Sequence, residues 1–195
     1  DLNPERVSCN ATAVDKVIAM PLVSVVMTSY NHARFLTQAI RSVLEQSVVD
    51  LELIIIENGS ADNSLDVIAS YPDTRLHLHT LTENIGATAA LNLAISHATG
   101  ELVALLNSDD YFLPGKLQRQ LEAFTQRPDV GAVFGNCMIV DEQGLPHPLH
   151  QNAALFHTHC TTRYEYLRHF FFANNCVCHP TVMVRRSVID TAVSY

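Results

Sequence analysis

The sequence predicts an α/β fold in which helices flank a mainly parallel β-sheet, with a Rossmann-like arrangement in a single domain. Apolar, β-branched runs alternate along the chain with segments of helical periodicity, as they do in right-handed βαβ units. The chain has 195 residues, of which 48% are hydrophobic and 16% charged, a globular composition large enough for one domain with a substantial core. Polar clusters follow the apolar runs, where sheets of this kind bind their ligands.

Strands are expected where apolar residues run without a break, because strands of a parallel sheet are buried on both faces. VSVVMTSY and LELIII fit this description, RLHLHTL alternates in character, and ELVALL stops abruptly at polar residues. The predicted strands are residues 23–30, 51–56, 75–81 and 101–106.

Helices are expected between these strands. Phe35, Leu36, Ile40 and Val43 recur at helical spacing within residues 33–46. The other predicted helices cover residues 64–71, the segment before a stop at Gly100, and residues 113–126, where Pro114 lies near the first turn. Lys116, on this last helix, is expected to be a surface residue.

The pattern changes after about residue 145, where histidine and aromatic residues become frequent. Residues 130–140 predict a kinked strand, 162–172 a helix and 177–184 a strand. We therefore expect a polar lead-in at residues 1–20 and an α/β portion at 21–145. Residues 146–195 are expected to continue the same domain.

The formal net charge is -8, which argues against non-specific nucleic-acid binding. No apolar window is long enough to span a bilayer, and the first twenty residues lack the shape of a signal peptide. The five cysteines are odd in number and form no CxxC pair. A cytoplasmic location is the expectation.

Four polar clusters follow the first four predicted strands. Because the carboxyl ends of parallel strands meet at one edge, we expect these clusters to lie together. Asp109 and Asp110 could be a solvated turn, yet adjacent carboxylates also suit Mg²⁺ or Mn²⁺, which prefer oxygen ligands. The clusters are Thr28–Asn31, Glu57–Ser60, Asn84–Gly86 and Asn107–Asp110.

These ordered motifs, over about residues 21–144, resemble the nucleotide-sugar-binding half of glycosyltransferase family 2, which has the GT-A fold. The clusters correspond to the family's T-x-Y-N-type loop, its D-D-G-S-type motif, its N-x-G loop and its D-x-D motif. The resemblance implies that Asp109 and Asp110 bind Mn²⁺ or Mg²⁺. It implies nucleotide contacts from Thr28, Tyr30, Asn31, Glu57, Asn58, Gly59, Ser60, Asn84, Gly86, Asn107 and Ser108.

The sequence departs from the family pattern at two places. Glu57-Asn58 stands where the family has two aspartates, which leaves the base preference open. Asn107 replaces the first aspartate of D-x-D, and an amide adds no charge to a metal site. Asp109 is then the expected main ligand, and weaker metal affinity is expected.

The resemblance implies transfer of a sugar from a nucleotide-diphosphate sugar, with UDP favoured, to an unknown glycan or lipid-linked acceptor. It also implies inverting chemistry and a role in polysaccharide or glycoconjugate biosynthesis, and it makes residues 146–195 the start of the acceptor-side portion of the domain. Peripheral membrane association of the full-length protein is compatible with this role. In the family a carboxylate well after the D-x-D motif is the general base. The candidates after Asp110 are Asp129, Asp141, Glu142 and Glu165, and none of them resembles the family's motif. The base is therefore expected beyond Tyr195, in a chain truncated at its C-terminus and inactive in transfer as it stands.

Two other functions stay open from the sequence. A nucleotidyltransferase also pairs an α/β sheet with a metal-bound diphosphate, although TSYNHARF lacks the glycine-rich basic loop that it would need. A non-catalytic binding or interaction module is compatible with Asn107 and the missing base.

Overall fold

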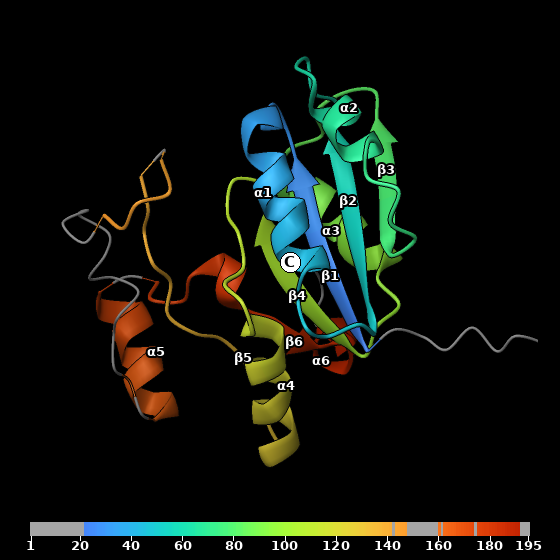
Figure 1. Cartoon of the computed structure of the whole chain (residues 1–195). Coiled ribbons are helices and arrows are strands. Elements are labelled where there is room, and N and C mark those ends of the chain that lie inside the picture. Colours follow the sequence, from blue (N-terminus) through green and yellow to red (C-terminus); the bar gives the residue numbers. More distant parts are fainter. Residues whose placement is uncertain (1–21, 142, 148–159, 161, 174, 192–195) are drawn as a thin grey trace, which may run out of the picture.

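The computed structural model describes residues 22–141, 143–147, 160, 162–173 and 175–191, within which six strands form one sheet (Figure 1). The strands are β1 (Val23–Ser29), β2 (Leu51–Asn58), β3 (Leu76–Leu81), β4 (Leu102–Asn107), β5 (Ala132–Val133) and β6 (Met183–Arg185). The helices are α1 (Ala33–Leu44), α2 (Ser64–Ala69), α3 (Ala87–His97), α4 (Lys116–Gln126), α5 (Arg163–Phe172) and α6 (Arg186–Thr191), with a 3₁₀ turn η2 (His179–Thr181).

The strand order is β3-β2-β1-β4-β6-β5. Strands β1 to β4 pair in parallel, while β6 runs antiparallel to both β4 and β5. The predicted α/β fold with a mainly parallel sheet is confirmed. Strands β1 and β4 lie side by side in the middle of the sheet, and the chain adds strands in opposite directions from this pair. Sheets of this kind bind their ligands at such a reversal point, outside the carboxyl ends of the strands.

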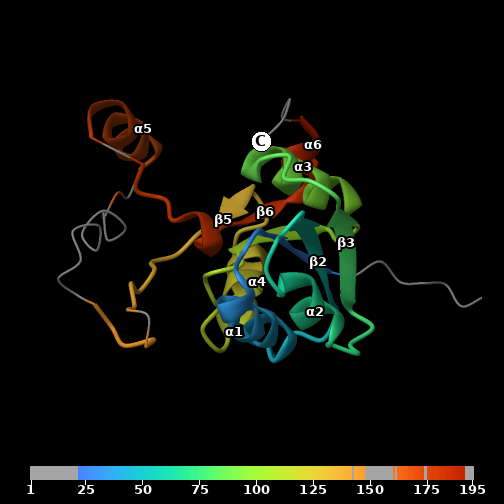
Figure 2. The same cartoon turned by 90° about the horizontal axis from the view of Figure 1, so that it is seen from above.

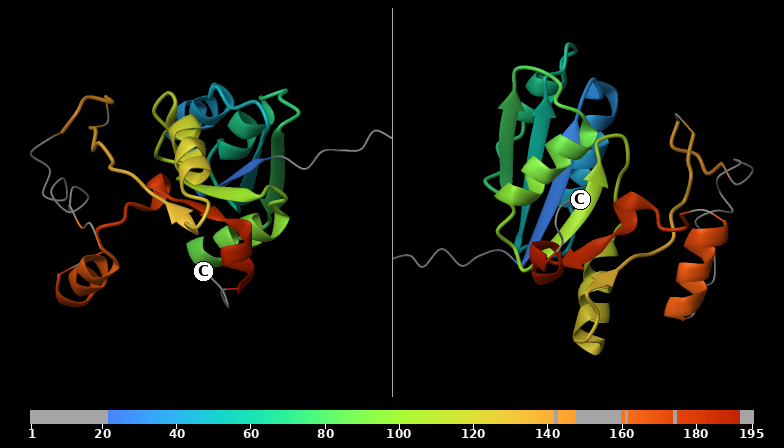
Figure 3. Two further views of the ribbon diagram at one scale, coloured as in Figure 1. Left: turned by 90° about the horizontal axis from the view of Figure 1, so that it is seen from below. Right: turned by 180° about the vertical axis from the view of Figure 1, so that it is seen from behind.

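Helices cover both faces of the sheet (Figures 2 and 3). Residues such as Met27 and Ile55 face α1, α2 and α4 in one core cluster, and both are fully buried. Their neighbours along the strands, such as Val26 and Ile54, face α3 in a second cluster. Strand alternation therefore sorts the apolar residues onto two buried faces, which explains the unbroken apolar runs.

The part after α4 is built differently. The strand predicted over residues 130–140 is wrong in extent: Ala132–Val133 pairs with β6 as β5, and Val140 forms only an isolated bridge to Pro146. Helix α5 stands apart from the sheet in every view (Figures 1 to 3), and the side chains of Phe171 and Phe172 are 82% and 86% exposed. No helix among the described residues has both the length and the apolarity to cross a bilayer.

Candidate functional site

The four polar clusters meet at the carboxyl edge of the parallel strands, as the sequence predicts. Thr28 pairs with Asn107 and Ser29 with Glu57, so β1, β2 and β4 end level with one another. Hydrogen bonds link the first cluster to the second, from Asn31 to Ser60, and the second to the third, from Asn58 to Asn84. The fourth cluster is linked through Ser108 to His32, the residue that follows the first cluster. The clusters thus form one connected polar rim.

Strand alternation divides this rim into a buried and an accessible side. Ser29, Glu57 and Ser108 are buried, at 1%, 3% and 2% exposure, on the side of α1. Thr28 and Asn107 are partly exposed and adjacent in register on the side of α3. At the ends of β1 and β4, Thr28 and Asn107 are therefore accessible from the side of α3, whereas Ser29, Glu57 and Ser108 are covered.

The loops after β1 and β2 are locked to each other. The backbone N–H of Asn31 donates to Ser60 Oγ at 2.9 Å, and Asn31 Oδ1 accepts from the backbone N–H of Ala61 at 2.8 Å. The Glu57 carboxylate accepts the backbone N–H of Ser60 at 3.0 Å and so closes its own turn. Tyr30 is 43% exposed beside these bonds, which leaves its ring free to meet a flat ligand group.

Asn58 holds the third loop by both ends of its amide. Its Nδ2 donates to Asn84 Oδ1 at 2.9 Å, and its Oδ1 accepts the backbone N–H of Ile85 at 3.0 Å. Asn84 Oδ1 also accepts from the backbone N–H of Gly86 at 2.8 Å. A carboxylate at position 58 could not donate to Asn84, so this departure from the family pattern has a physical reason.

Gly59 allows the second and third loops to approach. Its φ is +74°, and a Cβ built there would lie 2.6 Å from the carbonyl carbon of Glu83. That distance is too short for any side chain, so the rim depends on glycine at this position.

The carboxylates that follow β4 have distinct environments. Asn107 Nδ2 donates to Asp110 Oδ2 at 2.8 Å, while Asp109 is exposed. Burial raises the pKa of Asp110, the hydrogen bond from Asn107 opposes that rise, and the charge of Asp109 adds to it. Asn107 therefore offsets part of the repulsion between two adjacent carboxylates.

A divalent cation fits this pair. Among the residues that the structure describes, no three His, Cys, Asp or Glu side chains gather as a protein-only metal centre. Mg²⁺ and Mn²⁺ commonly take one or two carboxylates and fill their other positions with phosphate and water. Asp109 and Asp110 supply that kind of donor set.

Sequence reasoning missed two residues near this loop. His32 lies with Nδ1 2.8 Å from Ser108 Oγ, although nothing in its sequence position marks it. Lys116 was expected at the surface, but its Nζ is buried and has no hydrogen-bond partner among the described residues. The Nζ atom lies 3.6 Å from the centre of the Phe112 ring. Burial lowers the pKa of Lys116 to about 7.

The segment before β6 approaches the carboxylates from the other side. The backbone N–H of Leu105 donates to the carbonyl of Val182 at 3.1 Å, which aligns η2 with the end of β4. Burial raises the pKa of the Cys178 thiol, and the neighbouring Cys137 thiol and then Asp110 add to this effect. Cys178 therefore lies within electrostatic range of Asp110.

The described carboxylates among the general-base candidates make contacts with residues close to them in sequence. Asp129 pairs with Arg127 at 3.1 Å, and Asp141 Oδ1 accepts two backbone N–H groups of its own turn. Glu165 forms a capping box with Thr162 at the start of α5. Glu142 lies outside the described residues.

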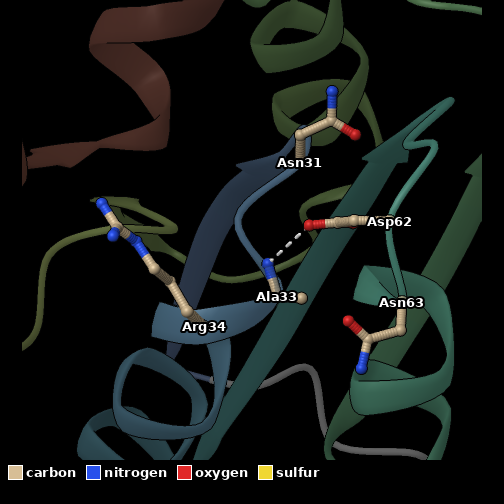
Figure 4. A pocket seen from close by; sticks show the side chains of 5 residues that line it. All are labelled: Asn31, Ala33, Arg34, Asp62 and Asn63. Carbon is tan, nitrogen blue, oxygen red and sulfur yellow. Dashed lines mark hydrogen bonds between the residues drawn. The ribbon is translucent and has the colours of Figure 1, made fainter.

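A hollow of about 370 Å³ lies beside the rim, at the N-termini of α1 and α2 (Figure 4). It is lined by Asn31, Ala33, Arg34, Asp62 and Asn63, and the Ala33 N–H donates to Asp62 across it at 3.1 Å. Asn31 is the one predicted nucleotide residue in this lining, so the hollow shares one residue with the rim and does not include the carboxylate loop.

The sequence model of glycosyl transferase family 2 matches residues 24–192. The UDP-Glc:alpha-D-GlcNAc-diphosphoundecaprenol beta-1,3-glucosyltransferase WfgD of Escherichia coli is 32% identical over 124 residues, which are 64% of this chain and 49% of that protein. The chain spans 37% to 50% of the length of four curated glycosyltransferases that it matches.

Solved structures share the fold at low sequence identity. S. aureus TarS 1–349 in complex with UDP-GlcNAc superposes with a TM-score of 0.67 at 22% identity, over 86% of this chain and 46% of that one. The mannosyltransferase PcManGT of Pyrobaculum calidifontis, in complex with GDP-Man and Mn²⁺, gives 0.66 at 20% identity, over 91% and 48%. The GT-A fold expected from the sequence is confirmed by these neighbours.

Proposed function

The chain belongs to glycosyl transferase family 2, and we propose that it forms the part of such an enzyme that binds a nucleotide-diphosphate sugar, with a UDP-sugar favoured. The observation that carries the proposal is the connected polar rim, which brings all four motif clusters to the carboxyl edge of β1, β2 and β4. The UDP-GlcNAc bound to TarS and the UDP-Glc in the name of WfgD support the choice of nucleotide.

Within this proposal the rim residues have different tasks. Thr28 and Asn107 offer hydrogen bonds to the nucleotide from the accessible side, and the exposed ring of Tyr30 can stack on its base. Glu57, Asn58 and Ser108 are buried, so they shape the loops instead of covering the ligand. Gly59, Ser60, Asn84 and Gly86 set the backbone of those loops.

Asp109 and Asp110 would hold Mn²⁺ or Mg²⁺, and the Mn²⁺ in the PcManGT complex supports this assignment. A bound ion acts as a Lewis acid that stabilises the negative charge developing on the leaving diphosphate. Asn107 keeps Asp110 oriented by its hydrogen bond, while exposed Asp109 is free to reach outward.

The acceptor half of the reaction is proposed in less detail. We expect direct displacement with inversion, in which a carboxylate removes the proton of the acceptor hydroxyl. The described carboxylates after Asp110 are engaged in local structure, so this base is expected elsewhere. The diphosphoundecaprenol in the name of WfgD supports a lipid-linked glycan as acceptor and a role in polysaccharide biosynthesis.

Calorimetry with UDP, in Mn²⁺ or in EDTA, tests the proposal. UDP should bind at least about tenfold more tightly with Mn²⁺, which is about 1.4 kcal/mol. Asp109→Ala should remove that difference in affinity. It should change the free energy of unfolding by no more than about 0.5 kcal/mol, because exposed carboxylates seldom contribute more to stability.

Glu101→Ala, which removes an exposed carboxylate at the opposite end of β4, is the matched control and should keep the metal dependence. Equal affinity in Mn²⁺ and in EDTA would disprove the metal role. Absence of any nucleotide binding, with GDP tested beside UDP, would favour a non-catalytic interaction module.

A further inference from the structure

His32 makes a long-range hydrogen bond to the middle residue of the strand-end motif Asn107-Ser108-Asp109. Its Nδ1 lies 2.8 Å from Ser108 Oγ, across 76 residues of sequence. Ser108 is 2% exposed, so its hydroxyl has no water to replace His32 as a partner. A buried hydroxyl that loses its partner is left unsatisfied at a cost in free energy, which gives this bond a defined structural effect.

The imidazole is itself held in place. The backbone N–H of His32 donates to Ser64 Oγ at 3.2 Å, and Ser64 in turn donates to Asp62 Oδ1 at 2.5 Å. The ring of Phe35 lies edge-on to the imidazole, with 5.9 Å between ring centroids and planes at 88°. Helices α1 and α2 therefore orient His32 before any ligand is present.

The bond acts on the residue that reaches the ligand. Ser108 lies on the side of α1, where its hydroxyl meets His32, whereas Asn107, the last residue of β4, is partly exposed on the opposite face of the sheet. Asp109 follows in the turn after the strand and is exposed. Fixing the Ser108 side chain therefore fixes the backbone from which Asp109 projects. Ser29, next to Ser108 at the end of β1, has a buried hydroxyl without a partner among the described residues, so pairing is not automatic here.

We propose that His32 is a positioning residue that, through Ser108, holds Asp109 in the orientation needed to bind a divalent cation together with a nucleoside diphosphate. The inference rests on the function proposed above. It predicts that His32 affects the metal-dependent part of nucleotide affinity and not nucleotide binding as such. Partners that orient metal ligands from behind are typically worth about 10–100-fold in metal affinity.

Two substitutions separate this role from simple capping of α1. In His32→Asn the short amide can reach the position of Nδ1 and keep the bond to Ser108, and asparagine is also a good N-cap. In His32→Gln the amide extends toward the position of Nε2 and leaves Ser108 without its partner. His77→Gln, at an exposed position on β3, controls for the substitution itself.

The experiment measures UDP affinity of the whole chain by calorimetry, in Mn²⁺ and in EDTA, for each variant. We expect His32→Gln to weaken UDP binding about tenfold in Mn²⁺ and less than about twofold in EDTA. His32→Asn and His77→Gln should stay within about twofold in both conditions. Ser108→Ala should resemble His32→Gln, and the double variant should lose no more than either alone, because both remove one shared bond.

Equal losses in Mn²⁺ and in EDTA, or a His32→Gln variant that binds like the unaltered chain, would overturn the positioning role. So would additive losses in the double variant. If the unaltered chain itself shows no Mn²⁺ dependence, the metal role fails first, and the inference about His32 fails with it. Should His32→Gln not fold, His32→Asn against Ser108→Ala gives the same comparison, because only the second lacks the bond.

Discussion

Residues 22–126 and residues 127–191 contribute to one sheet but are held by different means. The first part places β1 to β4 side by side in parallel, with apolar side chains buried on both faces against α1, α2, α3 and α4. The second part adds two short antiparallel strands, β5 and β6, and a helix, α5, whose Tyr166 ring meets the Phe134 ring edge-on.

The difference shows what each part can do. The first part has a rigid, doubly covered sheet and therefore a fixed rim, which a preorganised binding site requires. The second part exposes aromatic side chains, among them Tyr164 at 74%, and its two strands, β5 and β6, are short. Binding of the donor should thus depend on the first part, and the stability of the chain should too.

The largest expected effect comes from the core of the first part. Ile55→Ala, at a fully buried position in β2, should lower the free energy of unfolding by about 2–5 kcal/mol. Phe171→Ala, at the exposed end of α5, should change it by less than about 0.5 kcal/mol. Urea unfolding measures the free energy of unfolding of both variants. A loss for Phe171→Ala as large as that for Ile55→Ala would show that α5 is packed against other residues in solution and that the two parts do not differ in this respect.

The next effect tests whether the rim is as rigid as the core beneath it. Gly59 and Gly86 both have positive φ, so alanine is strained at either position by about 1–2 kcal/mol. Gly59→Ala should cost at least about 1 kcal/mol more, because its Cβ would meet the Glu83 backbone, whereas open space surrounds Gly86. Unfolding midpoints of the two variants measure the difference, and equal costs would mean that the rim yields.

Lys116, the first residue of α4, offers a stabilising substitution. Its Nζ is buried without a hydrogen-bond partner among the described residues, so Lys116→Met should raise the free energy of unfolding at pH 7 by about 1 kcal/mol or more. Because the folded pKa is about 7 and the ordinary value 10.5, the unfolded chain binds the proton more tightly between these pH values. The unaltered chain should therefore gain stability as the pH rises from 7 to 10.5.

Denaturation of the unaltered chain and of Lys116→Met at pH 7 and pH 9 tests this, with exposed Arg119→Met as the matched control. The gain between pH 7 and pH 9 should be smaller in Lys116→Met than in the other two proteins. A less stable Lys116→Met variant would mean that contact of the ammonium with the Phe112 ring outweighs its desolvation.

The smallest effect concerns the outer edge of the first part. The rings of His79 and His97 stack with centroids 3.8 Å apart, and burial, then the charges of His97 and His77, lower the pKa of His79. The unfolded chain takes up the proton near the ordinary value of 6.5, and the folded chain only at lower pH. Stability should therefore be complete above pH 6.5 and decline as the pH falls through 6.5.

Unfolding of the unaltered chain and of His79→Gln at pH 7.5 and pH 5.5 measures that decline. The variant should lose less stability than the unaltered chain across this interval. Identical losses would assign the pH dependence to other groups.

Several elements could be predicted because the information is local. The apolar runs of β1 and β2 and the periodic residues of α1 gave their places to within a few residues. Where pairing is remote the prediction was wrong: most of residues 130–140 has β-type composition, yet only Ala132 and Val133 join the sheet, with a strand about 50 residues away. Composition alone contains no information about such a partner.

The site follows the same division. The ordered motifs predicted which loops would meet, since strands of a parallel sheet end at a common edge. They did not indicate which of these residues are covered: Glu57 and Asn58 are both buried, with Glu57 holding its own turn through Ser60 and Asn58 holding the next loop through Asn84. Because Glu57 and Asn58 point to opposite faces of β2, their burial depends on the segments that pack over each face, which a sequence motif does not specify.

The sequence by itself determined the family, the alternating α/β order and the rim on which Asp109 and Asp110 lie, because these depend on residue type and chain order. Only the tertiary structure decided that Asn107 restrains Asp110, that His32 holds Ser108 and that Lys116 buries its amine. The physical reason is distance along the chain. The bond from His32 joins residues 76 apart in sequence, the burial of Lys116 depends on the packing around the start of α4, and even the short-range Asn107 bond depends on how the turn after β4 folds.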